Sequence, residues 1–220
     1  MALVVVAILF WYDRERMQRK AALQLMRSNI SDNLHTEVNN ALQDINILSE
    51  IATIKADKEP VQSKNYINEI NYKSRNMITV MDDMLWSINP ANDTMQKFIA
   101  RAKEFAASIS YSKNAVVHVQ ADKQILMLKP DMKLRHELMM IYKTSLNWLM
   151  NEIESKNVTI QLNYINNQLQ LNMFGEAAQP KMQEVNIIES KLKERATTIN
   201  AVLDVLVEDH GTAIVLSVKM

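Results

Sequence analysis

The chain has 220 residues, enough for one domain with an extended element or for two small domains. Its 25 basic residues balance its 25 acidic residues, so the overall charge gives no reason to expect a nucleic acid as partner. The lack of cysteine excludes disulfides, thiolate catalysis and cysteine-based zinc sites, and the presence of only two glycines, Gly175 and Gly211, excludes a glycine-rich phosphate loop.

Residues 1–20 begin with an unbroken apolar run from Ala2 to Tyr12. Four basic residues follow it: Arg14, Arg16, Arg19 and Lys20. A membrane span needs about 20 apolar residues, so this run predicts the last part of a transmembrane helix that begins upstream of Met1. The basic residues place the following chain on the cytoplasmic side of the inner (plasma) membrane. A buried core helix is the alternative interpretation of the run.

Two stripes of apolar residues at helical spacing follow in residues 21–92. The first comprises Met26, Ile30, Leu34, Val38, Ala41, Ile45, Leu48 and Ala52, and the second Ile67, Ile70, Met77, Met81, Leu85 and Ile88. A polar connection from Lys55 to Asn65, which contains Pro60, separates them and predicts a helical hairpin. Because each stripe is narrow, we expect two copies to pair as a dimeric four-helix bundle.

Residues 93–220 have the pattern of a compact α+β domain. We predict a helix through Phe98 and Ile109, a strand at Ala115–Gln120, a short extended piece at Ile125–Lys129 and a helix at Leu134–Ile153. Strands at Val158–Tyr164 and Gln168–Met173 flank an Asn166–Asn167 turn, and a helix at about Glu184–Asn200 precedes strands at Ala201–Val207 and Thr212–Val218. This order predicts helices on one side of a mixed sheet.

The four histidines are His35, His118, His136 and His210, and no two have the spacing of metal ligands on a helix, so we assign no metal site. His35 follows the stripe residue Leu34 and therefore lies on the flank of the first helix. A solvated imidazole at this position is nucleophilic at neutral pH.

Two segments resemble bacterial sensor histidine kinases. Residues Arg27 to Leu42, which contain Leu34-His35, resemble the helix that carries the phosphorylated histidine. Residues 81–90, Met-Asp-Asp-Met-Leu-Trp-Ser-Ile-Asn-Pro, are similar to the family's Met-Asp-Asp-Ile-Val-Trp-Ser-Ile-Asn-Pro segment. The resemblance extends from the end of the membrane segment to the C-terminus. It implies a dimerisation hairpin, an ATPase domain of the Bergerat type that binds ATP and Mg²⁺, and a response regulator as partner.

The resemblance assigns His35 as the phosphoacceptor. Thr36 stands where the family usually has an acidic residue, and Glu37 is the nearest carboxylate that could accept the second ring proton. Thr36 can accept a hydrogen bond but is a poor base, so these three residues predict a phosphorylation site with weakened proton acceptance.

The ATP domain departs further from the family. Thr144 and Trp148 replace the glutamate and the magnesium-binding asparagine, which leaves Asn147 and Asn151 as the nearby amides. Gly175 replaces the adenine-binding aspartate. The two glycines that should follow it are replaced by Ala177 and Gln179.

The Gly211-Thr212 pair of the family is retained in this chain, and it is the other candidate for contact with the cofactor.

Three interpretations remain open: a working histidine kinase, a signalling module of the same fold that does not hydrolyse ATP, and a structural membrane-tethered helical protein. The last leaves the Leu34-His35 and Trp86-to-Pro90 segments unexplained. We expect a role in two-component signalling, with little or no ATP binding.

Overall fold

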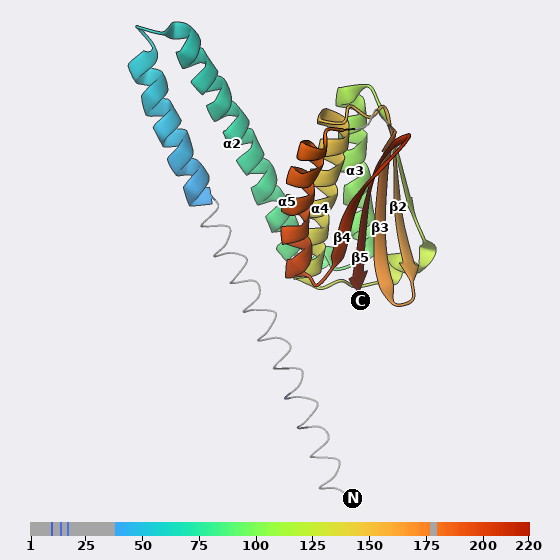
Figure 1. The fold of residues 1–220 in the computed structure, drawn as a ribbon. Helices are drawn as coiled ribbons and strands as arrows, with labels where there is room; N and C mark the ends of the chain where they lie inside the picture. The colour runs from blue at the N-terminus through green and yellow to red at the C-terminus, as the bar shows by residue number, and fades with distance from the viewer. Residues whose placement is uncertain (1–9, 11–13, 15–16, 18–37, 177–179) are drawn as a thin grey trace, which may run out of the picture. The chain divides into compact units, whose positions relative to one another are not determined.

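The computed structural model describes Phe10, Arg14, Met17, residues 38–176 and residues 180–220. The chain divides into two compact units, Met1–Ile88 and Asn89–Met220. The first is helical where it is described, and the second combines helices with a five-stranded sheet, so the predicted α+β class is confirmed (Figure 1).

A helical hairpin forms the described part of the first unit (Figure 1). Its first helix is described over residues 38–55, and α2 spans Pro60–Ile88. The predicted connection was too long, because Pro60 begins α2 instead of breaking the pattern. Proline is favoured at the first position of a helix, where its missing N–H would have no partner within the helix.

The inner face of the first helix follows the predicted stripe. Val38, Ala41, Ile45 and Leu48 are half-buried and Ala52 is buried. Polar contacts join this helix to α2. The Ser63 hydroxyl donates to the Ala52 carbonyl at 2.8 Å, the Lys73 ammonium pairs with Asp44 at 2.7 Å, and the Lys55 ammonium donates to the Gln62 side chain at 2.6 Å. The predicted hairpin is therefore confirmed over these residues.

Two members of the predicted α2 stripe do not face the first helix. Ile67 and Leu85 are 49% and 60% exposed, whereas Ile70, Met77 and Met81 are half-buried. A single neighbouring helix covers only a narrow strip of α2, so apolar residues on the flank of that strip stay exposed within one chain.

The second unit begins with the short 3₁₀ helix η1 (Pro90–Asn92). It continues with α3 (Met95–Lys113), β1 (Val116–Ala121), the 3₁₀ helix η2 (Lys123–Met127) and α4 (Met132–Asn151). The predicted extended piece at Ile125–Lys129 was wrong, because Ile125 donates its N–H to the Asp122 carbonyl at 3.1 Å within η2. A short apolar run fits a turn of helix as well as a strand when sequence periodicity is the only guide.

The sheet has the order β1-β2-β3-β5-β4. Its remaining elements are β2 (Asn157–Ile165), β3 (Gln168–Glu176), α5 (Met182–Thr198), β4 (Val202–Glu208) and β5 (Gly211–Lys219). β1 is parallel to β2, and the other neighbours are antiparallel. Helices α3, α4 and α5 lie on the same face, as predicted (Figure 1).

The Asn166–Asn167 turn has the predicted hairpin geometry. Both residues have positive φ, 52° and 61°, which is the conformation of a type I′ turn. Asparagine tolerates this left-handed conformation better than most residues, so the turn forms without glycine.

The core of the second unit lies between α4 and the central strands. Leu171 pairs with Leu216 and Met173 with Ile214 across β3 and β5, and all four are at most 1% exposed. The Tyr142 hydroxyl of α4 donates to the Ala102 carbonyl of α3 at 2.7 Å, and burial raises the pKa of its phenol. Tyr142 therefore joins the two helices as a neutral phenol.

Candidate functional site

The predicted phosphoacceptor residues His35, Thr36 and Glu37 lie outside the described residues. The description of the first helix begins at Val38, three residues after His35. Of the predicted membrane run, only Phe10 is described. Among the helices that the structure does describe, none is both long and apolar enough to cross a membrane.

The chain between α2 and α3, residues 89–94, is the link between the two units and contains no glycine. Helix α2 ends at Ile88, and the Asn89 side chain accepts from the Ala91 N–H at 3.0 Å. The Asp93 N–H donates to the Pro90 carbonyl at 3.2 Å, and Thr94 caps α3. These hydrogen bonds therefore close local turns within the link.

Helix α4 carries the positions that the sequence resemblance assigns to magnesium binding. Trp148 is buried, with 7% of its surface exposed, whereas Asn147 and Asn151 are exposed and Thr144 is half-buried. Magnesium needs near-octahedral oxygen ligands, which an indole cannot supply. The two amides therefore lie on the solvent side of α4, away from the buried position that Trp148 fills.

Gly175, near the end of β3, is the residue that the sequence resemblance matches to an adenine-binding aspartate. A Cβ atom on Gly175 would lie 2.5 Å from Ser155 Oγ and 3.1 Å from Leu149 Cδ2. Both distances are below ordinary van der Waals contact. The Ser155 hydroxyl therefore occupies the space that a side chain at position 175 would need.

Thr212, the cross-strand partner of Gly175, lies beside this contact. The side chains of Ser155 and Thr212 are 2% and 0% exposed, and neither hydroxyl has a hydrogen-bond partner in the part of the chain that is described. The neighbouring Glu176 is exposed and accepts from the Asn157 side chain at 2.9 Å. Ala177 and Gln179 lie outside the described residues.

Gly211, the other predicted contact residue, is buried at the start of β5. A Cβ atom there would overlap the Gly175 carbonyl oxygen and would come within 2.7 Å of the Phe174 ring. Its φ is not positive, so glycine is needed for the close approach of β3 and β5 and not for a special turn. This requirement gives the Gly211-Thr212 pair a role in sheet packing.

Two arginines of the second unit form tertiary ion pairs. Arg135 is 1% exposed and pairs with Asp93 at 2.8 Å. Arg195 of α5 pairs with Glu137 of α4 at 3.0 Å. Among the described residues, no three His, Asp or Glu side chains are grouped to hold a metal ion.

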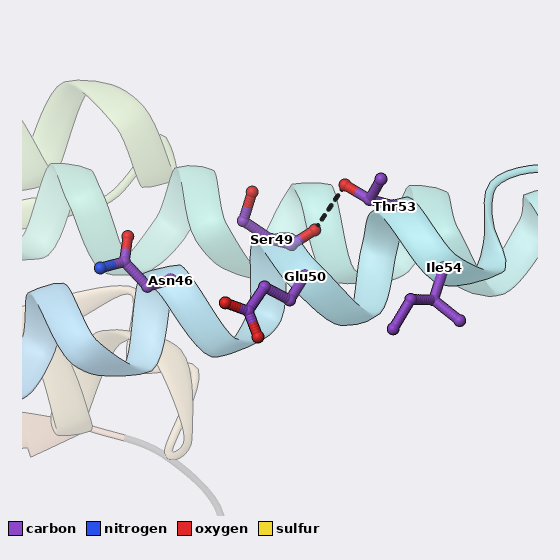
Figure 2. A pocket seen from close by; sticks show the side chains of 5 residues that line it. All are labelled: Asn46, Ser49, Glu50, Thr53 and Ile54. Carbon is purple, nitrogen blue, oxygen red and sulfur yellow. Dashed lines mark hydrogen bonds between the residues drawn. The ribbon is translucent and has the colours of Figure 1, made fainter.

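A hollow of about 530 Å³ lies on the first helix of the hairpin. Figure 2 shows its five lining side chains, Asn46, Ser49, Glu50, Thr53 and Ile54, along this one helix. Thr53 donates its hydroxyl to the Ser49 carbonyl at 2.8 Å, so that donor is already satisfied within the helix. Since polar groups do not converge here from several elements, the hollow is not a built ligand site.

Solved structures with the same architecture are histidine kinases. The histidine kinase domain of the Erythrobacter litoralis EL346 blue-light activated histidine kinase has a TM-score of 0.52 at 13% identity, covering 80% of this chain and 95% of that one. Acinetobacter baumannii AdeS has a TM-score of 0.54 at 6% identity, covering 84% and 97%. The fold is that of a histidine kinase.

Full-length ShkA in complex with AMPPNP has the same fold, with a TM-score of 0.53 at 9% identity. The alignment covers 85% of this chain but only 45% of ShkA. No protein-family model and no curated protein sequence matches the chain. At identities this low, the likeness shows that the chain has the histidine kinase fold. It does not show that the chain has the activity of these kinases.

The residues at the positions that the sequence resemblance assigns to magnesium and adenine do not fit these groups. Trp148 is buried and supplies no oxygen ligand, and Gly175 offers no carboxylate while Ser155 fills the adjacent space. Thr212 is present, but its buried hydroxyl alone supplies neither charge nor metal coordination.

The contact between Gly175 and Ser155 makes a first prediction. Gly175→Ala should lower the free energy of unfolding by about 1 to 3 kcal/mol, because its methyl group would overlap the Ser155 hydroxyl. In a Ser155→Ala background the penalty should be clearly smaller, since the nearest atom has been removed. Urea denaturation of the four proteins measures both penalties. An equal penalty in the two backgrounds would show that Ser155 does not fill this space.

Proposed function

We propose that this chain is a membrane-attached signalling protein of the two-component type that does not use its ATPase-like domain as a phosphate donor. In this proposal His35 exchanges phosphate with an aspartate of a response regulator. The observation that carries the proposal is the Ser155 hydroxyl in the space beside Gly175, where the resemblance expects an adenine-binding carboxylate.

Energetic considerations support weak ATP binding. Losing one hydrogen bond to a charged group costs about 1.5 to 3 kcal/mol, and each 1.4 kcal/mol changes a dissociation constant about tenfold. The metal ligand at Trp148 and the carboxylate at Gly175 are separate losses, so their effects compound. Together they correspond to a weakening of about two to four orders of magnitude.

The proposed chemistry at His35 follows from its imidazole. A neutral ring nitrogen attacks the phosphorus of an aspartyl phosphate, the nitrogen–phosphorus bond forms, and the aspartate carboxylate leaves. The proton on the other ring nitrogen passes to a carboxylate, for which Glu37 is the nearest candidate in the sequence. Thr36 is proposed to orient the ring through a hydrogen bond.

A working histidine kinase is the second candidate. The fold and the retained, buried Thr212 favour it, and the solved structure of ShkA contains AMPPNP in the same fold. In this alternative, Asn147 or Asn151 would have to provide the metal ligand from the solvent side of α4.

Homodimerisation through the hairpin is supported by one face of α2. Ile67, Ile78 and Leu85 are 49%, 67% and 60% exposed. At about 100° per residue, their spacings of eleven and seven place them on one face to within roughly 20°. An apolar stripe left exposed on a hairpin helix is suited to pairing with a second copy in a four-helix bundle.

Attachment to the membrane is proposed from the sequence of residues 1–20. The apolar run from Ala2 to Tyr12 and the basic residues after it have the order expected where a helix leaves the membrane on the cytoplasmic side. The signalling units would then face the cytoplasm, where a response regulator could reach them. Nucleic acid has no place in this proposal.

Phosphorylation at His35 gives the second prediction. Incubation of the purified chain with labelled phosphoramidate should give an acid-labile label, because nitrogen–phosphorus bonds hydrolyse in acid. His35→Gln should abolish the label, and His118→Gln, which changes an exposed histidine of the other unit, should retain it. Equal labelling of His35→Gln and the parent would remove His35 from its proposed role.

The third prediction concerns the dimer. Residues 21–220 should sediment as a dimer at tens of micromolar, and Ile78→Glu should give a monomer, because it would bury an unpaired charge between copies. Val61→Glu is the matched control: Val61 is 75% exposed but lies roughly 100° around the helix from Ile78. A monomeric parent, or the same dimer in both variants, would contradict the proposed interface.

A further inference from the structure

The link between the two units is fastened to the second unit at two points. The Asp93 carboxylate pairs with the Arg135 guanidinium at 2.8 Å, and the Met95 N–H donates to the Leu128 carbonyl at 2.9 Å. Met95 itself is fully buried. The chain is therefore anchored within seven residues of Ile88, where α2 ends.

The Asp93–Arg135 pair is asymmetric in its exposure. The Arg135 side chain is 1% exposed, whereas the Asp93 side chain is 50% exposed. A buried guanidinium without a carboxylate carries a large desolvation penalty, while a half-exposed carboxylate can be solvated by water. The half-exposed Asp93 thus supplies a carboxylate to a guanidinium that is shielded from water.

Arg135 also belongs to the start of α4. The Asp131 side chain caps this helix by accepting from the Leu134 N–H at 2.7 Å, and Arg135 donates to the Pro130 carbonyl at 3.4 Å. Asp93 is therefore bound to the first turn of the helix that carries Thr144 and Trp148. A displacement of the link at Asp93 acts directly on α4.

A proline and local turns restrict the segment between Ile88 and Asp93. Pro90 restricts one φ, Asn89 caps η1, and the Asn92 N–H donates to the Asn89 carbonyl at 3.0 Å. A segment without these turns would absorb motion of α2 instead of passing it on.

We propose that the Asp93–Arg135 ion pair is a coupling latch that makes the link from α2 and the first turn of α4 open and close as one cooperative unit. With the pair formed, a change in α2 reaches α4. With the pair broken, the link moves independently of α4. The latch does not depend on phosphate transfer, so it is tested separately from the proposed function.

Hydrogen exchange of the full chain, resolved to individual amides, tests the latch. In the parent, the amides of Asp93 and Met95 should share the exchange rate of those of Arg135 and Leu138. In Asp93→Asn, the backbone amides of residue 93 and Met95 should exchange about tenfold faster or more than in the parent. The reason is that the charge-assisted hydrogen bond between residue 93 and Arg135 is weakened. Asp122→Asn is the control, since Asp122 is exposed and its side chain makes no capping hydrogen bond.

A second variant separates the latch from the stability of the domain. Arg135→Met removes the guanidinium from the pair and keeps a long side chain at the buried position, so the link should be released while the sheet stays protected. Fast exchange at Met95 with full protection at Leu171 and Leu216 is the expected result. Unchanged exchange at Met95 in both Asp93→Asn and Arg135→Met, or link amides that already exchange much faster than α4 in the parent, would overturn the proposal.

Discussion

The packing of α4 is the constraint on which the second unit depends. Twelve of its 20 residues are buried, so the helix is held from several directions at once. Tyr142 ties it to α3 through the Ala102 carbonyl, Glu137 ties it to α5 through Arg195, and Leu149 lies close to Gly175 of β3. Because so much of α4 is enclosed, a change of residue on it alters packing as well as chemistry. Trp148 is an example: it adds a large buried ring at the position that the sequence resemblance assigns to a metal ligand.

The contact between Ser155 and Gly175 connects this packing to function. Ser155 lies in the connection between α4 and β2, and its hydroxyl fits against β3 only because position 175 has no side chain. The resemblance assigns the adenine-binding carboxylate to this position, and the contact leaves no room for a side chain there. In the proposed function, close packing and weak nucleotide binding are therefore two consequences of the same approach of Ser155 to β3.

Much of this architecture could be predicted from sequence periodicity. The hairpin stripe from Val38 to Ala52 and the strands have repeats of 3.6 and 2, and the Asn166–Asn167 turn has a known residue preference. The burial of Arg135 could not be predicted from the sequence. The residues Leu-Arg-His-Glu are typical of a solvated helix turn, and the partner Asp93 lies 42 positions earlier in the chain. The role of Ser155 has no local signal either, since it depends on the missing side chain of Gly175. His35, Thr36 and Glu37 stay predictions, because they lie outside the described residues.

The most direct test of the central claim is calorimetric titration of the purified chain with ATP in the presence of magnesium. A chain whose adenine and metal positions are filled by Ser155 and Trp148 should give no measurable heat of binding, or a dissociation constant of about a millimolar or weaker. Repeating the titration without magnesium should change nothing, because no described residue of α4 is placed to hold the metal at the Trp148 position. A magnesium-dependent dissociation constant in the low micromolar range or below would contradict the account and favour a working histidine kinase.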